Sequence, residues 1–139
     1  MNTNNTNTPR DKGEKRILYK ELSYEIVGSC FGTQNELGRY AREKQYGDLL
    51  EKKLKERGLS YEREKFISKT GVDANRADFI VENTIIVEIK AKPFLTREDY
   101  YQLLRYLEFA NLPLGMLVNF RQKYLRPKRI INAKFEPPQ

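Results

Sequence analysis

Two short runs of β-branched residues, 77–81 and 85–90, lie three residues apart, and this spacing constrains the fold more than any other feature of the chain. Runs of this kind joined by a short polar connection are typical of a β-hairpin. If the strands pair around the three-residue turn, Asp78 lies directly opposite Glu88, with their Cβ atoms roughly 5 Å apart. The sequence therefore predicts two carboxylates that face each other across a hairpin.

Facing carboxylates destabilise a sheet, and a bound cation would explain their presence. Because side chains alternate along a strand, Lys90 shares the face of Glu88. Hard oxygen ligands suit Mg²⁺ or Mn²⁺, and the lysine could orient or deprotonate a water, or stabilise charge on a phosphate. The spacing D-x9-E-x-K of Asp78, Glu88 and Lys90 thus predicts a metal-dependent site. A bare match is more typical of a solvated strand face with one salt bridge, and the site gains support from the shared hairpin and from the helices expected before and after it.

Composition excludes several other chemistries. The chain of 139 residues contains no histidine, so Ser-His and Cys-His catalysis and Cys/His zinc motifs are absent. Chemistry must therefore depend on carboxylates, lysine, tyrosine or a bound metal. The single cysteine, Cys30, cannot form an intramolecular disulfide, which favours a reducing, cytoplasmic setting. No stretch approaches the roughly 18 consecutive apolar residues of a membrane span, so no membrane partner is expected.

The net charge of +7 is unevenly distributed and points to a polyanion as partner. Five basic residues fall within one short run near the C-terminus: Arg121, Lys123, Arg126, Lys128 and Arg129. Lys92 extends the face of Glu88 and Lys90, either as a phosphate contact or as a surface lysine. A positive surplus also keeps many proteins soluble, so the charge alone only makes nucleic-acid binding a candidate.

The hydrophobic pattern predicts one α/β domain over residues 16–135, preceded by a disordered arm over residues 1–15. Helices are expected from residue 17, over about 35–57 and from Thr96 to about 110. Strands are expected over 61–68, 77–81, 85–90 and 114–120, with an edge strand over 130–135. A mixed sheet flanked by helices buries these faces most simply.

Asp78 and residues 88–90 resemble the PD-(D/E)XK phosphodiesterase superfamily, whose αβββαβ core has the element order expected here. The resemblance can be narrowed, because four segments in the same order are similar to the bacterial GxxExxY protein family. These segments read ADFIV, IVEIKA, QLLRYL and GMLVNF, at residues 77–81, 86–91, 102–107 and 115–120. With the preceding helix, the similarity covers about residues 18–131.

The resemblance implies that Asp78 and Glu88 bind metal, that Lys90 is the catalytic lysine and that a helix glutamate completes the site. The naming motif falls on residues 40–46, where Tyr40 replaces the expected glycine. Likewise, Ala77 stands where the superfamily pattern has proline.

Two further assignments follow from the resemblance with alternatives open. Within the naming motif Glu43 matches, with Glu36 as a competitor, and either could be a solvated surface partner instead. Gln102 is placed near the catalytic lysine, where it could contact phosphate. The alternative for Gln102 is a polar residue at a helix surface.

The leading hypothesis is therefore an enzyme that hydrolyses nucleic-acid phosphodiesters with Mg²⁺ or Mn²⁺, with DNA favoured over RNA. The competing hypothesis is a catalytically silent module of the same fold that binds nucleic acid or protein. A dimer-forming role is a third alternative.

Overall fold

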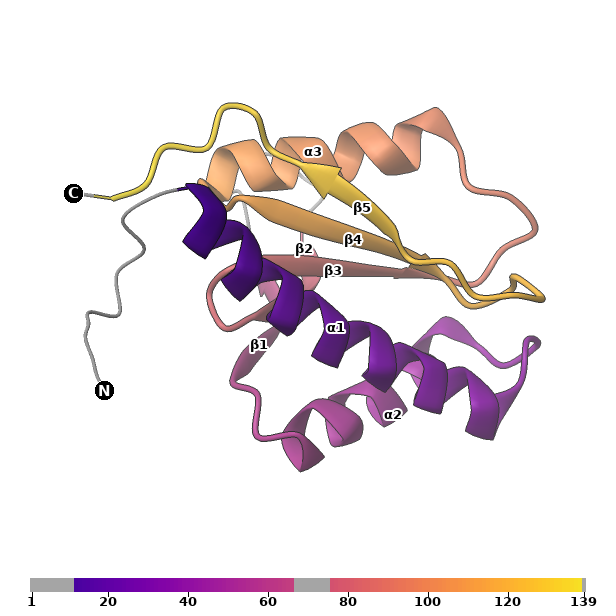
Figure 1. Ribbon diagram of the computed structural model, residues 1–139. Coiled ribbons are helices and arrows are strands. Elements are labelled where there is room, and N and C mark those ends of the chain that lie inside the picture. The colour runs from indigo at the N-terminus through magenta and orange to yellow at the C-terminus, as the bar shows by residue number, and fades with distance from the viewer. Residues whose placement is uncertain (1–11, 67–75, 139) are drawn as a thin grey trace.

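The computed structural model describes residues 12–66 and 76–138, which form three helices and a five-stranded mixed sheet (Figure 1). This confirms the expected α/β class and the αβββαβ order of the core. In chain order the elements are α1 (Lys12–Leu37), α2 (Glu43–Glu56), β1 (Tyr61–Phe66), β2 (Arg76–Val81), β3 (Ile85–Lys90), α3 (Arg97–Ala110), β4 (Leu114–Asn119) and β5 (Lys128–Ile131). No helix within these ranges combines the length and apolar character needed to cross a membrane.

The strands follow one another across the sheet in the order β1-β2-β3-β4-β5. Neighbours are antiparallel except for β3 and β4, which run parallel because α3 carries the chain back between them. In this register Lys90 pairs with Asn119, the last residue of β4. The carboxyl ends of β3 and β4 therefore lie together at one end of the sheet.

Helices cover both faces of the sheet, with α1 and α2 on one side and α3 on the other (Figure 1). The side chains of β3 alternate between the two faces of the sheet. Val87 and Ile89 pack toward α1 and α2, while Ile86 packs toward α3. Glu88, two residues after Ile86, lies on the same face of β3 and is also buried. Burial on both faces explains the apolar composition of β3, and it makes Glu88 an exception that needs a function.

The prediction that the second helix begins at about residue 35 is wrong. The first helix, α1, continues to Leu37, and α2 begins only at Glu43. Gly38 has φ +75, which ends α1 in a conformation that favours glycine. The hydroxyl of Tyr46 donates to the carbonyl of Gly38, and the Tyr46 ring stacks on Phe120 with centroids 4.4 Å apart. The buried tyrosine thus fixes the turn and places Glu43 at the start of α2.

The other boundaries differ by a few residues. The first helix begins at Lys12, inside the arm expected over 1–15, and residues 1–11 lie outside the described part of the chain. Residues 67–68 of the strand expected over 61–68 also lie outside it. The edge strand expected over 130–135 instead spans Lys128–Ile131. It ends there because Ile131 pairs with Leu114, the first residue of β4, and no partner strand continues beyond.

Candidate active site

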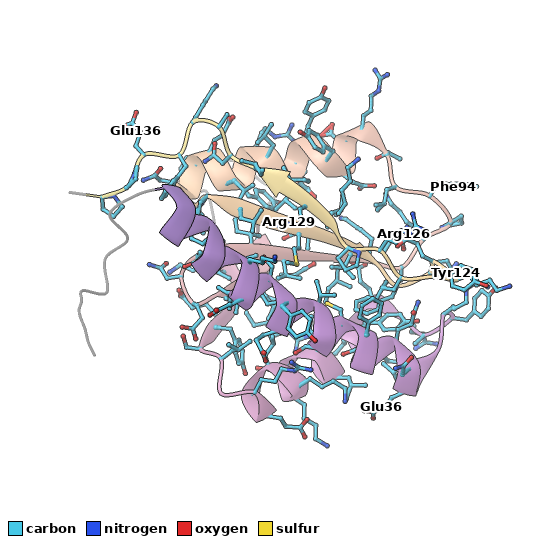
Figure 2. The ribbon with its side chains drawn as sticks, in the orientation of Figure 1. Glu36, Phe94, Tyr124, Arg126, Arg129 and Glu136 are labelled. Carbon is cyan, nitrogen blue, oxygen red and sulfur yellow. The ribbon has the colours of Figure 1, made fainter. Side chains whose placement is uncertain are left out.

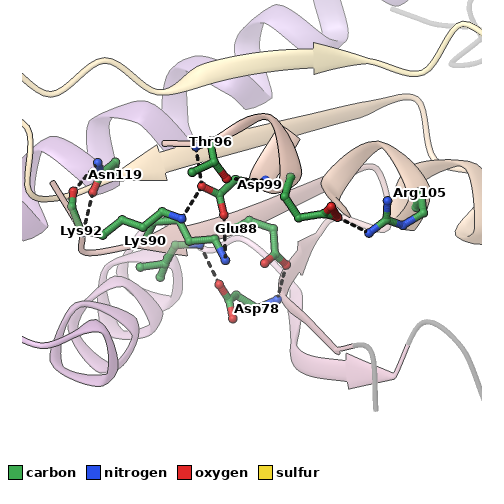
Figure 3. A network of polar contacts seen from close by, with 10 residues as sticks. Asp78, Glu88, Lys90, Lys92, Thr96, Asp99, Arg105 and Asn119 are labelled. Atoms are coloured by element: carbon green, nitrogen blue, oxygen red, sulfur yellow. Dashed lines mark hydrogen bonds and ion pairs between the residues drawn. The ribbon is translucent and has the colours of Figure 1, made fainter. Parts of the chain in front are cut away.

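Asp78 and Glu88 lie at the point where strands β2 and β3 separate (Figure 3). The ladder pairs Val81 with Ile85, as the three-residue turn requires, and its last pair is Phe79 with Val87. After the Phe79–Val87 pair the backbone ladder stops, and the N–H of Asp78 donates to Glu88 Oε1 at 2.8 Å. The N–H of Ile89 donates to Asp78 Oδ2 at 2.7 Å. Each carboxylate therefore takes the place of a backbone carbonyl on the opposite strand, and the two face each other as expected.

Burial raises the pKa of both carboxyl groups of this pair. Glu88 is 4% exposed, and burial together with the charge of Asp78 raises its pKa to about 8. Burial, with a further contribution from Glu43, raises the pKa of Asp78 to about 6. Within the described residues, the second oxygen of each carboxylate accepts no hydrogen bond. Two hard oxygen donors that repel each other and retain free lone pairs fit a divalent cation.

A pocket of about 440 Å³ opens beside Asp78, between the start of α2 and the ends of β1, β2 and β3. Glu43 lines this pocket, and its charge raises the pKa of both Asp78 and Glu88. Glu36 instead forms an ion pair with Lys53 on α2. The structure thus brings Glu43, and not Glu36, to the pocket that Asp78 lines.

The three carboxylates do not yet converge on a single point. Across the described ranges, no three Asp, Glu, Cys or His side chains lie close enough together to hold a metal ion. Glu43 is exposed at the first residue of α2, so its side chain can move. Asp78 and Glu88 could supply fixed oxygen donors to a hard cation, and water could complete its coordination.

Lys90 ends β3 and lies between the carboxylate pair and α3 (Figure 3). Its Nζ is 3.9 Å from Asp99 Oδ1, and Lys92 Nζ is 2.5 Å from Asp99 Oδ2. The charge of Lys90 also opposes the rise in the pKa of Asp78 and Glu88. A single aspartate therefore attracts both lysines of this face toward the start of α3.

Asp99 itself is fixed by the N-terminal cap of α3. Its Oδ2 accepts the N–H of Thr96 at 2.8 Å, and its own N–H donates to Thr96 Oγ1 at 3.2 Å. Burial alone would raise the pKa of Asp99, but the hydrogen bonds from Lys92 and Thr96 outweigh it and lower the pKa. This capping box holds the Asp99 carboxylate beside Lys90 and Lys92, and its lowered pKa favours the charged form.

Sequence reasoning missed three residues around this site. Asp99 was predicted only as an acidic residue in the first turn of a helix. Its contacts with Lys90 and Lys92 could not be predicted, because they depend on how α3 packs against the sheet. Tyr106 is buried on α3, and burial followed by the charges of Glu88 and Asp78 raises its pKa. Glu64 lines the pocket with φ 54, at the β1 position that the register skips between Arg63–Phe79 and Lys65–Ala77. In the sequence, Glu64 belongs to an ordinary run of alternating charges that carries no signal.

Gln102 lies half-buried on α3, one helical turn from Tyr106. In the described part of the chain it makes no hydrogen bond with Lys90 or with either carboxylate. Its expected place beside Lys90 stays a prediction.

The basic run is distributed over the loop after β4 and both faces of β5. The guanidinium of Arg121 donates to the carbonyls of Arg39 and Ala91, so it has a structural role. Lys123 and Arg126 are exposed in the loop after β4. The last two residues of the run point to opposite faces of β5, because strand side chains alternate: Lys128 lies over the Tyr100 ring at 5.6 Å, and Arg129 lies on the other side.

The comparison with family models returns one match, described as the PD-(D/E)XK nuclease superfamily, over residues 20–131. The matched range runs from α1 through β5 and contains Asp78, Glu88 and Lys90. No curated protein and no solved structure matches the chain. The narrower similarity to the GxxExxY family stays a prediction.

Proposed function

Because the chain belongs to the PD-(D/E)XK nuclease superfamily, we propose that it hydrolyses nucleic-acid phosphodiester bonds in a reaction that depends on a divalent metal. One observation carries the proposal: Asp78 and Glu88 are fixed face to face by the backbone of the opposite strand. A purely structural role would not favour a buried and a half-buried carboxylate that face each other, because each raises the cost of ionising the other.

Mg²⁺ or Mn²⁺ is the proposed cofactor, with Asp78 and Glu88 as fixed ligands and Glu43 as a mobile third. The free oxygens of the first two are hard donors, and Glu43 lines the same pocket as Asp78. When bound, the cation would polarise the scissile phosphate and neutralise charge that develops on it. Its charge would also favour the ionised forms of Asp78 and Glu88.

Lys90 is proposed to orient the attacking water and to donate hydrogen bonds toward the scissile phosphate. Its contact with Asp99 at 3.9 Å is long, so the ammonium group retains hydrogen-bonding capacity for substrate. Lys92 would contact a neighbouring phosphate, although it must first leave its shorter contact with Asp99. Gln102 is proposed as a residue that positions Lys90 or a phosphate.

The proposed substrate is nucleic acid, with DNA favoured over RNA. The test is a cleavage assay with purified protein on single-stranded, duplex and branched DNA and on RNA, each with Mg²⁺, Mn²⁺ or EDTA. Cleavage that requires metal and is lost in Glu88→Gln but kept in Glu36→Gln is expected. Binding of these substrates without any cleavage would contradict the proposal and favour a catalytically silent binding module.

A further inference from the structure

Three loops meet at the end of the sheet where β3 and β4 finish, and we call them together the loop rim (Figure 1). They are residues 38–42 between α1 and α2, residues 91–96 between β3 and α3, and residues 120–127 between β4 and β5. The first leads directly into Glu43, and the second begins directly after Lys90. The loop rim therefore borders the candidate active site on two sides.

Hydrogen bonds connect the three loops to one another. The Nε of Arg39 donates to the carbonyl of Arg121 at 3.1 Å, and the Nε of Arg121 donates to the carbonyl of Arg39 at 3.0 Å. Arg121 also reaches the carbonyl of Ala91 at 3.2 Å. From the end of β4, the side chain of Asn119 accepts the N–H of Lys92 and donates to its carbonyl. The loop rim is thus held in place before any ligand arrives.

The charge of the loop rim has one sign. Its residues include six lysines and arginines and no aspartate or glutamate: Arg39, Arg42, Lys92, Arg121, Lys123 and Arg126. Apart from Lys92, which pairs with Asp99, none of the six forms an ion pair with a described carboxylate. Such a surface attracts a polyanion and repels a second copy of itself.

Each loop also carries one exposed aromatic side chain. Tyr40 is 74% exposed, Phe94 is 81% exposed and Tyr124 is 75% exposed. Figure 2 places Phe94 and Tyr124 at the same end of the molecule. Cations lie over two of the rings, since Lys123 is 5.6 Å from the Tyr124 centroid and the Arg121 guanidinium is 5.4 Å from that of Tyr40. Aromatic rings alternating with cations form the surface that single-stranded nucleic acid uses.

We propose that the loop rim binds an unpaired stretch of nucleic acid beside the scissile phosphate, with bases stacked on Tyr40, Phe94 and Tyr124. This inference rests on the proposed nuclease function and names its substrate class. An unpaired base exposes its flat face to a ring, whereas the bases of a duplex are already stacked on each other. The cations of the loop rim would neutralise the phosphates between the stacked bases.

The test measures binding without cleavage, by fluorescence anisotropy in EDTA. The probes are a labelled oligothymidylate, an oligouridylate of equal length and a blunt DNA duplex. Wild-type protein is expected to bind both single strands more tightly than the duplex, and Tyr124→Ala or Phe94→Ala should each weaken single-strand binding roughly tenfold. Tyr124→Phe keeps the ring and should bind like wild type.

Phe109→Ala is the matched control, because Phe109 is 68% exposed on α3 and lies outside the loop rim. It should leave all three affinities unchanged. Tighter binding of the duplex, or equal effects of Tyr124→Ala and Phe109→Ala, would overturn the inference. So would a dimer of the wild-type protein in sedimentation that Tyr124→Ala dissociates, because the rings would then serve self-association.

The two proposals fail in different ways. Single-strand binding that depends on the rings, in a protein that cuts nothing, would contradict the nuclease function and leave the loop rim as a binding site. Metal-dependent cleavage of duplex and single strands at equal rates, unchanged in Tyr124→Ala, would overturn the loop rim and leave the nuclease function intact.

Discussion

Asp78 and Glu88 are each held by the backbone of the other's strand, through N–H contacts of 2.7 and 2.8 Å to their carboxylate oxygens. Neither carboxylate can rotate away to relieve the repulsion without losing its hydrogen bond. Without a cation, burial and then the neighbouring negative charges favour the protonated forms, which is why the pKa values of both groups are raised. The protonation and the stability of the metal-free protein are therefore linked.

The metal-free protein should lose stability as the pH rises. The folded-state pKa values, about 6 for Asp78 and about 8 for Glu88, exceed the ordinary values of 3.8 and 4.5, so the folded state binds more protons than the unfolded state between them. This contribution to stability is fully present below the ordinary values and is lost as the pH rises through about 6 and then about 8. Thermal melting in EDTA across this window measures the effect, and Glu88→Gln should flatten the dependence. Identical pH profiles for wild type and Glu88→Gln would contradict it.

Asp78→Asn should stabilise the metal-free protein at alkaline pH, by an amount on the order of 1 kcal/mol. The substitution removes one of two facing charges, and the asparagine oxygen can still accept the N–H of Ile89. Chemical denaturation in EDTA gives the free energy of unfolding. Asp48→Asn is the control, since Asp48 forms surface ion pairs with Lys44 and Arg63 and its replacement should bring no gain. A less stable Asp78→Asn protein would make the carboxylate structural.

Glu43→Gln should weaken Mn²⁺ binding roughly tenfold or more, because Glu43 lines the pocket beside Asp78. Glu36→Gln should not change Mn²⁺ affinity, because Glu36 pairs with Lys53 away from that pocket. Isothermal titration calorimetry on the two variants and wild type compares two glutamates on either side of the turn between α1 and α2. Equal Mn²⁺ affinities for wild type and Glu43→Gln would remove Glu43 from the metal site.

The basic run should separate into binding and structural residues. Lys123→Ala and Arg126→Ala should each reduce the salt dependence of nucleic-acid binding by about 0.7 to 0.9 in the log-log slope, one phosphate contact each. Arg121→Ala should instead cost about 1 to 3 kcal/mol of stability, because its guanidinium holds two loop carbonyls. Lys20→Ala, on the exposed surface of α1, is the control for both measurements. A salt slope unchanged in both loop variants would take these residues out of the interface.

Local pattern was enough to predict the hairpin, the alternation of β3 and the Thr96 cap of α3, because each depends on residues close in sequence. The break after Leu37 could not be predicted in this way, since the periodicity of apolar residues continues across it. The turn is stabilised by Tyr46, which stacks on Phe120 from a distant part of the chain. The contacts of Asp99 with two lysines likewise depend on the packing of α3 against the sheet.

Charge and spacing predicted the candidate carboxylates but not how the basic run is distributed. The sequence of the run did not show that Lys128 and Arg129 alternate along β5, or that Arg121 donates to backbone carbonyls. The loops that gather around the site come from three separate parts of the chain. The parallel pairing of β3 and β4 brings two of these loops together, and the Arg39–Arg121 contacts join the third to them.

Comparing Lys90→Ala with Asp78→Asn tests the proposed nuclease function most directly, with Mg²⁺-dependent cleavage and Mn²⁺ affinity measured on the same preparations. Lys90→Ala should abolish cleavage while Mn²⁺ still binds, because the carboxylate ligands are intact, whereas Asp78→Asn should lose both. Cleavage by wild type that persists unchanged in Lys90→Ala, or Mn²⁺ binding that persists unchanged in Asp78→Asn, would contradict the site proposed for this protein.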